Sequence, residues 1–131
     1  ALTDTLRIET VSADKRHVEA TMPIVPEVFQ PHGYLHGGAT IALLATVASI
    51  GTEQNTDFDN DRPFGIDVPV RHRTSGQEGT LRGVAALARV FALGSALLQY
   101  STAGASARYK VMSLLPGGAD CETNDIYQFK Y

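Results

Sequence analysis

A second cysteine, an excess of basic charge and a long apolar run are all missing from this sequence. With Cys121 as its only cysteine, the chain has no intrachain disulfide and no multi-cysteine zinc site, and it fits a reducing compartment. Its net charge of −3 gives no electrostatic reason to expect nucleic acid or an anionic membrane as a partner. No apolar run reaches the roughly 18–20 residues of a membrane span, and we expect no signal peptide. A cytoplasmic protein without nucleic-acid or membrane partners is therefore expected.

The chain contains enough hydrophobic residues to form one core. Hydrophobic residues make up 44% of the 131 residues and charged residues 19%, the composition of an ordinary globular domain. A domain of this size buries roughly two thirds of the surface of its unfolded chain. We predict a single domain over residues 1–131, in which residues 116–131 are a polar tail that shows no strand or helix pattern.

The stretch from Gln30 to Glu53 is the centre of the prediction. From residue 37 or 38 to residue 53 it is apolar almost all the way round, which predicts a helix buried inside the protein. Backbone N–H groups at a helix N-terminus favour negative charge, so the Gly37 N–H is suited to polarise a thioester carbonyl. Gln30 and His36 flank the same turn. The alternative is that Gly37 and Gly38 only let the helix enter a crowded core, with His36 a buried, hydrogen-bonded histidine.

Segments on both sides of this helix alternate polar and apolar residues, as strands with one buried face do. Residues 4–11 and 17–24 predict a hairpin around a turn at 12–15, with Val18, Ala20, Met22 and Ile24 inward. After a solvated acidic loop at 56–63, strands are predicted in 63–75 with an edge or bulge at Pro69, in 79–91 with a bulge at Gly83, in 96–103 and in 107–115. The alanine content of residues 79–91 alone would also permit a helix there. An α+β fold, an antiparallel sheet of five or six strands wrapped around one long buried helix, satisfies this order.

The order of these motifs resembles the hotdog-fold acyl-CoA thioesterases. HGYLHGGATIALL lies between the hairpin and the segments GIDVPVRHRTS and EGTLRG, and the resemblance extends from about Glu19 to Ser95. It is greatest to the branch that contains 4-hydroxybenzoyl-CoA thioesterase and the 1,4-dihydroxy-2-naphthoyl-CoA hydrolases. The resemblance implies the hotdog fold and hydrolysis of an acyl-CoA with an aromatic acyl group. It implies no metal and no cofactor, because coenzyme A is part of the substrate.

The resemblance also implies roles for individual residues. Gln30 and His36 match positions that bind and orient the thioester, and Gly37 matches the backbone donor to its carbonyl oxygen. Ser49 matches a hydroxyl that helps to place the attacking water or the acyl group. Contacts with the nucleotide and pantetheine parts of coenzyme A are implied for His72, Thr74, Gly94 and Ser95, with Arg71 and Arg73 as candidates for its phosphates. The alternative for this last group is a solvated strand end.

One position departs from the family pattern. The catalytic carboxylate, Glu in this branch and Asp in a neighbouring one, is expected nine residues after His36, where this chain has Ala45. A carboxylate there attacks the thioester or activates water, and a methyl group does neither. The chain is then either a thioesterase inactivated at this position, which traps its substrate, or a natural acyl-CoA-binding protein. A hydratase acting on enoyl-CoA is disfavoured, because the helix carries no Asp.

The spacing along the helix predicts a site shared by two chains. Gly37 and Ala45 are eight residues apart, about 12 Å along a helix axis. An oxyanion donor must lie about 3 Å from the carbonyl oxygen, and the nucleophile must reach the attached carbon. One helix cannot supply both groups to one thioester, whereas two helices related by a two-fold axis can. We therefore predict a homodimer, or a dimer of dimers, with shared sites.

Overall fold

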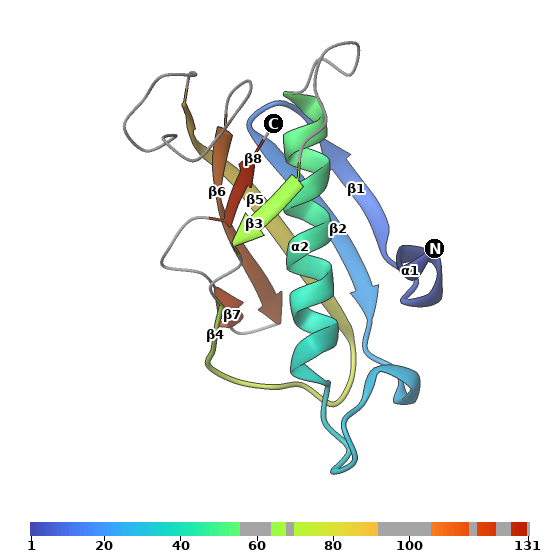
Figure 1. Ribbon diagram of the computed structural model, residues 1–131. Helices are drawn as coiled ribbons and strands as arrows, with labels where there is room; N and C mark the ends of the chain where they lie inside the picture. The colour runs from blue at the N-terminus through green and yellow to red at the C-terminus, as the bar shows by residue number, and fades with distance from the viewer. Residues whose placement is uncertain (56–63, 68–69, 92–105, 116–117, 123–126, 131) are drawn as a thin grey trace.

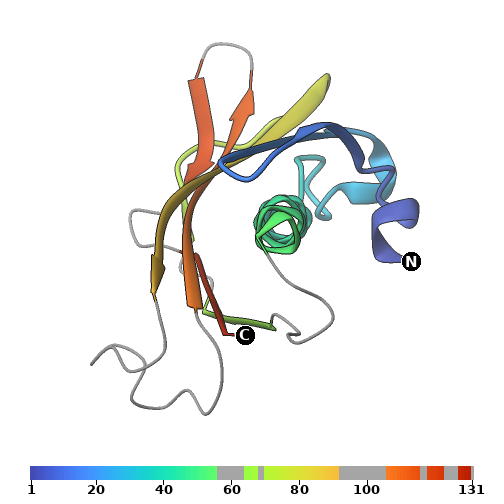
Figure 2. The ribbon, with the colours of Figure 1, turned by 90° about the horizontal axis from the view of Figure 1, so that it is seen from above.

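An 18-residue helix, α2 (Gly37–Gln54), lies in the hollow of a curved antiparallel sheet (Figure 1). The computed structural model describes residues 1–55, 64–67, 70–91, 106–115, 118–122 and 127–130. Seen from above, the sheet bends around α2, and the short helix α1 (Leu2–Thr5) lies on the opposite side of α2 from β6 (Figure 2). The strands are β1 (Glu9–Ala13), β2 (His17–Pro23), β3 (Phe64–Asp67), β4 (Arg71–His72), β5 (Thr80–Phe91), β6 (Ser106–Leu115), β7 (Gly118–Glu122) and β8 (Tyr127–Lys130).

The strands pair in the order β1-β2-β5-β6-β7-β4, and β8 pairs with both β6 and β3. Eight strands are present among the described residues, so the predicted number of five or six is not confirmed. The predicted edge at Pro69 falls between β3 and β4, and residues 68 and 69 lie outside the described residues. The strand predicted at 96–103 and the acidic loop at 56–63 also lie outside them.

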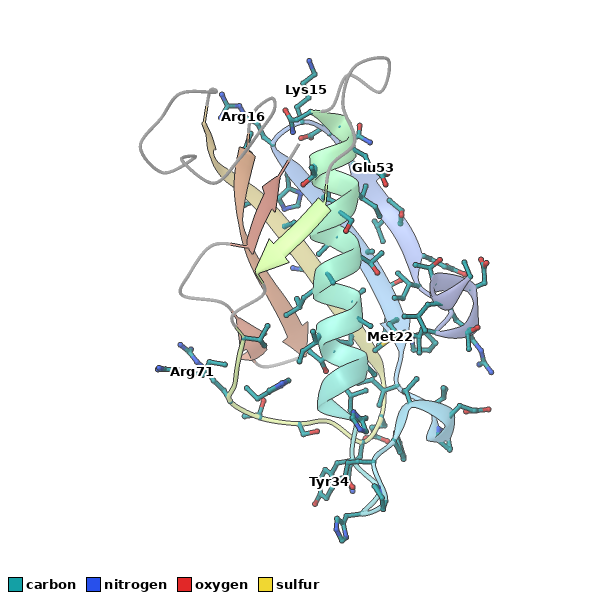
Figure 3. All side chains as sticks on the ribbon, viewed as in Figure 1. Lys15, Arg16, Met22, Tyr34, Glu53 and Arg71 are labelled. Carbon is teal, nitrogen blue, oxygen red and sulfur yellow. The ribbon has the colours of Figure 1, made fainter. Side chains whose placement is uncertain are left out.

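The core confirms the alternation predicted for the second strand. The four residues predicted to point inward are all buried, and they pack with α2 residues: Val18, Ala20, Met22 and Ile24. On α2 the fully buried apolar positions are Leu43, Leu44, Val47 and Ala48, spaced so that they share one face. Met22 lies between β2 and α2 (Figure 3). The opposite face of α2 is only partly buried, although the sequence predicted burial on all sides.

The prediction for the first strand is wrong in its first half. Residues 2–5 form α1, and β1 begins only at Glu9. Between them, Arg7 takes a φ of +56°, which ends the helix and redirects the chain. Leu6 and Ile8 still pack against the core, so their spacing reflects a turn with two apolar contacts rather than a strand.

The hairpin turn is also one or two residues later than predicted. Ser12 and Ala13 belong to β1, and the turn is built on Asp14. Its carboxylate accepts hydrogen bonds from the backbone N–H groups of Arg16 and His17, both at 2.8 Å. These two bonds hold the pKa of Asp14 below its ordinary value.

Two further differences concern the second half of the chain. Residues 116–131 contain β7 and β8, because each pairs with β6, and a polar composition does not reveal such pairing. The bulge predicted at Gly83 is instead a register shift between Leu87 and Arg89. Gly83 is where α2 packs closely on the sheet, since an added Cβ would lie 2.7 Å from Leu43 Cγ. Among the described residues, no helix is long and apolar enough to span a membrane.

Candidate active site at the start of helix α2

His36 caps the N-terminus of α2. Its backbone is extended, with φ −68° and ψ 129°, and its Nδ1 accepts a hydrogen bond from the Gly38 N–H at 2.8 Å. Its carbonyl oxygen accepts from the N–H groups of Ala39 and Thr40, at 3.0 and 3.3 Å. Because Nδ1 accepts a bond, a neutral His36 carries its proton on Nε2 and keeps a second donor. His36 is exposed, so the alternative of a buried core histidine does not apply.

Gly37 contributes the one N–H at the start of the helix that has no hydrogen-bond partner among the described residues. A helix begins with four N–H groups that lack a partner one full turn earlier, here those of residues 36–39. The His36 N–H donates to the Val28 carbonyl at 2.8 Å, and the N–H groups of Gly38 and Ala39 donate to Nδ1 and to the carbonyl oxygen of His36. The Gly37 N–H is left at the positive end of an 18-residue helix, in a partly exposed position. It is therefore available to a carbonyl oxygen that gathers negative charge.

A second imidazole lies against Gly37. An ideal Cβ added to Gly37 would lie 3.2 Å from Cε1 and 3.3 Å from Nε2 of His72. Similarly, a Cβ added to Gly38 would lie 3.0 Å from Nδ1 of His36. Each of the two glycines thus makes room for one imidazole ring. The structure brings His72 to the start of α2, next to the candidate oxyanion donor.

Two hydrogen bonds to Leu35 hold the segment after β4 against this turn. The Leu35 N–H donates to the Gly76 carbonyl at 2.8 Å, and the Ser75 hydroxyl donates to the Leu35 carbonyl at 3.1 Å. The chain runs from β4 beneath the N-terminus of α2 and on to β5 (Figure 1). Sequence reasoning did not single out Ser75, since a lone serine 40 residues from its partner leaves no spacing signal.

The turn before the helix is closed by Gln30. Its side-chain Oε1 accepts from the His32 N–H, its carbonyl accepts from the Gly33 N–H, and its N–H donates to the Tyr34 carbonyl. Gly33 has a φ of +86°, which favours glycine. The side-chain amide nitrogen of Gln30 makes no hydrogen bond within the part of the chain that the structure describes. Gln30 is therefore ordered by its own turn and retains a donor. Tyr34 projects at the tip of this turn (Figure 3).

Ala45 lies two turns along α2 and lines a cavity of about 500 Å³. Ser49, one turn further on, lines the same cavity, and its hydroxyl has no hydrogen-bond partner among the described residues. Glu53 also lines it, near the C-terminal end of α2 (Figure 3). The remaining lining residues come from α1, β1 and α2 and the turn between the first two: Leu2, Thr3, Ile8, Thr10, Ala42, Thr46 and Ile50. The cavity leaves space for a longer side chain at position 45.

The residues predicted to contact coenzyme A divide into two groups. Arg71, Arg73 and Thr74 are exposed on the segment that also carries His72, close to the start of α2. Arg71 points away from α2 (Figure 3). Gly94 and Ser95 lie outside the described residues, so their predicted roles stay predictions.

A second cavity, of about 300 Å³, lies beside His36 and Gly38. Glu27 lines it and forms an exposed ion pair with Arg7, at 3.7 Å. Its other lining residues are apolar: Leu2, Leu6, Val28, Phe29, Ala39 and Ala42. The sequence analysis did not single out Leu2, which lies before the strand predicted at residues 4–11 and belongs to α1.

Comparison with known proteins places this site in a family context. No protein-family model matches the chain. The chain is 34% identical over 84 residues to the 1,4-dihydroxy-2-naphthoyl-CoA hydrolase of Listeria monocytogenes, a match that covers 64% of the chain and 68% of that protein. It is 35% identical over 83 residues to the proofreading thioesterase EntH of Cronobacter turicensis, covering 63% of the chain and 60% of that protein.

Solved structures extend the similarity to the whole fold. A thioesterase variant from Staphylococcus aureus superposes with a TM-score of 0.84 at 21% identity, covering 99% of this chain and 97% of that one. A thioesterase from Haemophilus influenzae gives a TM-score of 0.78 at 21% identity, covering 98% and 80%. The fold similarity and the sequence identity to the Listeria enzyme lead to one conclusion. The chain belongs to the hotdog-fold thioesterase family.

Proposed function

We propose that this chain binds the thioester of an acyl-CoA at the start of α2 and polarises its carbonyl with the Gly37 N–H. The observation that carries the proposal is the Gly37 N–H, which has no hydrogen-bond partner among the described residues, whereas the N–H groups of Gly38, Ala39 and Thr40 all donate to His36. Donors preorganised at the positive end of a helix stabilise charge that develops on a carbonyl oxygen. In this proposal the His36 Nε2 and the Gln30 amide orient the thioester, and His72 packs beside it.

We further propose an aromatic acyl group. The support is that the Listeria and Escherichia coli relatives are named as 1,4-dihydroxy-2-naphthoyl-CoA hydrolases, enzymes of an aromatic thioester. The exposed guanidinium groups of Arg71 and Arg73, on the segment beside the start of α2, are our candidates for the phosphates of coenzyme A.

Position 45 limits what the chain does after binding. We propose that it is the position of the missing carboxylate, so that this chain hydrolyses its substrate slowly. The S. aureus thioesterase has been solved with a glutamate changed to alanine and with a glutamine changed to alanine, and these positions are 15 residues apart. Gln30 and Ala45 have the same separation. The same Ala45 also supports a second candidate, a natural protein that binds acyl-CoA without cleaving it.

Binding and cleavage are separated by one pair of measurements. Titration calorimetry of the purified chain with benzoyl-CoA should give stoichiometric binding that is tighter than binding of coenzyme A alone. Release of free thiol from the same mixture should be slow, because no carboxylate stands at position 45. If benzoyl-CoA binds no more tightly than coenzyme A, the acyl group has no site and the proposed function is wrong.

We also propose that each site is shared by two chains, as the separation of Gly37 and Ala45 along one helix requires. A mixed dimer tests this sharing. One chain carries Ala45→Glu together with Gly37→Pro, so it has a carboxylate but no N–H donor. The other chain is unchanged and supplies Gly37. If the site is shared, mixing these two chains should create thioesterase activity that neither has alone.

The matched control pairs the unchanged chain with a chain that carries only Gly37→Pro, which leaves no carboxylate in either subunit. Light scattering should show a dimer or a larger assembly in both mixtures. Activity that fails to rise on mixing, in samples shown to contain mixed dimers, would mean that each chain builds its site alone.

A further inference from the structure

The cavity beside Ala45 extends mainly toward the C-terminal end of α2. Of the other α2 residues that line it, Ala42 comes before position 45 and four come after it: Thr46, Ser49, Ile50 and Glu53. Ser49 and Glu53 follow Ala45 at intervals of four residues, so the three lie along one face of the helix. An acyl group whose thioester is held at position 45 therefore finds its space along this face, in the direction of Glu53.

Glu53 is an acidic residue at a place where a basic residue is favoured. It is the second-last residue of α2, and the last turn of this helix contains no basic residue. The carbonyl groups at a helix C-terminus carry partial negative charge, which disfavours a carboxylate and favours a cation. The Glu53 carboxylate is exposed and lines the cavity, so it is accessible to a ligand from there.

The described residues supply no cation to this carboxylate. Glu53 forms no ion pair with any of them, and no basic residue is among those that line the cavity. Lys15 lies at the same end of α2, where its carbonyl accepts a hydrogen bond from the Asn55 side chain at 2.8 Å, but its side chain extends past the helix end (Figure 3). This end of the cavity therefore combines a carboxylate with the negative end of the helix dipole.

We infer that Glu53 selects an acyl group that carries a cationic amine at the end remote from the thioester, an inference that rests on the proposed function. Position 53 is about 12 Å beyond position 45 along the helix axis. A helical side chain is directed back toward the N-terminus, which brings the carboxylate nearer to position 45. An aromatic ring with an amine opposite the thioester spans the distance that remains. Its ammonium group interacts with both the Glu53 carboxylate and the C-terminal end of α2.

The selectivity expected from this arrangement is moderate, because Glu53 is exposed. An exposed ion pair and an interaction with a helix end each change affinity by a small factor, and together we expect about fivefold or more. Salt screens both interactions, so the preference for the amine should decrease as the ionic strength rises.

The test compares two acyl-CoA ligands of the same shape. 4-(Aminomethyl)benzoyl-CoA carries an ammonium group opposite the thioester, and 4-ethylbenzoyl-CoA carries a methyl group in its place. Titration calorimetry of the unchanged chain should give a dissociation constant for the amine that is lower by about fivefold or more. Glu53→Gln should abolish this preference, because the amide keeps the size of the side chain and removes its charge.

Glu9→Gln is the matched control. Glu9 is also exposed, and it lines neither cavity. Its neighbour Thr10 lines the larger cavity, and successive residues of a strand point to opposite faces. The substitution therefore removes the same charge from the chain without changing the cavity, and the preference for the amine should persist.

The possible results separate the inference from the proposed function. If both ligands bind the unchanged chain equally, or if the amine is still preferred after Glu53→Gln, Glu53 does not select the acyl group and the inference is overturned. An equal loss of preference in Glu9→Gln overturns it as well, since the effect would then follow net charge. If neither ligand binds more tightly than coenzyme A, the proposed function itself fails.

Discussion

Replacing Ala45 with glutamate is expected to raise the rate of acyl-CoA hydrolysis on the order of 10³-fold, because it restores the proposed nucleophile or general base. The structure supplies the space for this side chain, since position 45 is partly buried and lines a cavity of about 500 Å³. Overpacking, which normally opposes a larger side chain in a core, is therefore avoided. The rise should appear in kcat, measured by thiol release from benzoyl-CoA and from alkyl-CoA substrates.

Two variants separate the effect of the new carboxylate from the effects of side-chain size and of Glu53. Ala45→Gln has nearly the same size as Ala45→Glu without the charge, so it should give little or no increase. Glu53→Gln tests the other acid of the cavity, whose position is eight residues beyond Ala45 and about 12 Å along the axis. Ala45→Glu should retain its gain when Glu53→Gln is added. No gain on any acyl-CoA would favour a natural acyl-CoA-binding protein over a thioesterase.

Replacing Gly37 with proline in the Ala45→Glu background should lower kcat by about 10²- to 10³-fold, the effect of losing one oxyanion donor. Residue 37 is the first residue of α2, where proline is compatible with a helix and removes only the N–H. His36, the preceding residue, already has the extended backbone that proline requires, with ψ 129°. The substitution therefore deletes the donor and leaves the helix in place.

Gly37→Ala is the matched control for this change. Both substitutions add a Cβ, which would lie 3.2 Å from Cε1 of His72, but alanine keeps the N–H. The difference in kcat between the proline and alanine variants therefore measures the N–H itself, and circular dichroism checks that the helix content is equal. If both variants lose the same activity, the displaced His72 ring causes the loss and Gly37 is no oxyanion donor.

The most predictable part of the fold was α2 and the strand before it. Both follow from local patterns that packing reinforces: a run of apolar residues for the helix, and buried Val18, Ala20 and Met22 at a spacing of two for β2. The strand predicted at residues 4–11 was wrong in its first half, because there the local sequence pattern does not correspond to the way the residues pack. Leu6 and Ile8 share the spacing of a strand, yet they contact the core from a turn after α1.

The candidate site shows the same division. Gln30, His36 and Gly37 are close together in the sequence, so the sequence was enough to place them together, while the donor role of Gly37 stays a prediction. The contact of His72 with Gly37 could not be predicted from the sequence, because it depends on the segment after β4 passing beneath the N-terminus of α2. Ser75 was missed, because Leu35, which accepts its hydrogen bond, is 40 positions away in the sequence.

The sequence by itself determined the buried helix, the glycine-histidine turn at its start and the absence of a carboxylate at position 45. These are properties of adjacent residues, which hydrogen bonding and apolar periodicity specify locally. Only the tertiary structure decided that His36 accepts hydrogen bonds from three N–H groups, that the Gly37 N–H has no partner among the described residues, and that Leu2 lies beside the same cavity as Ala45. Such relations depend on how the chain is held at the start of α2 and on contacts between distant segments, which the folding of the whole sheet around α2 brings together.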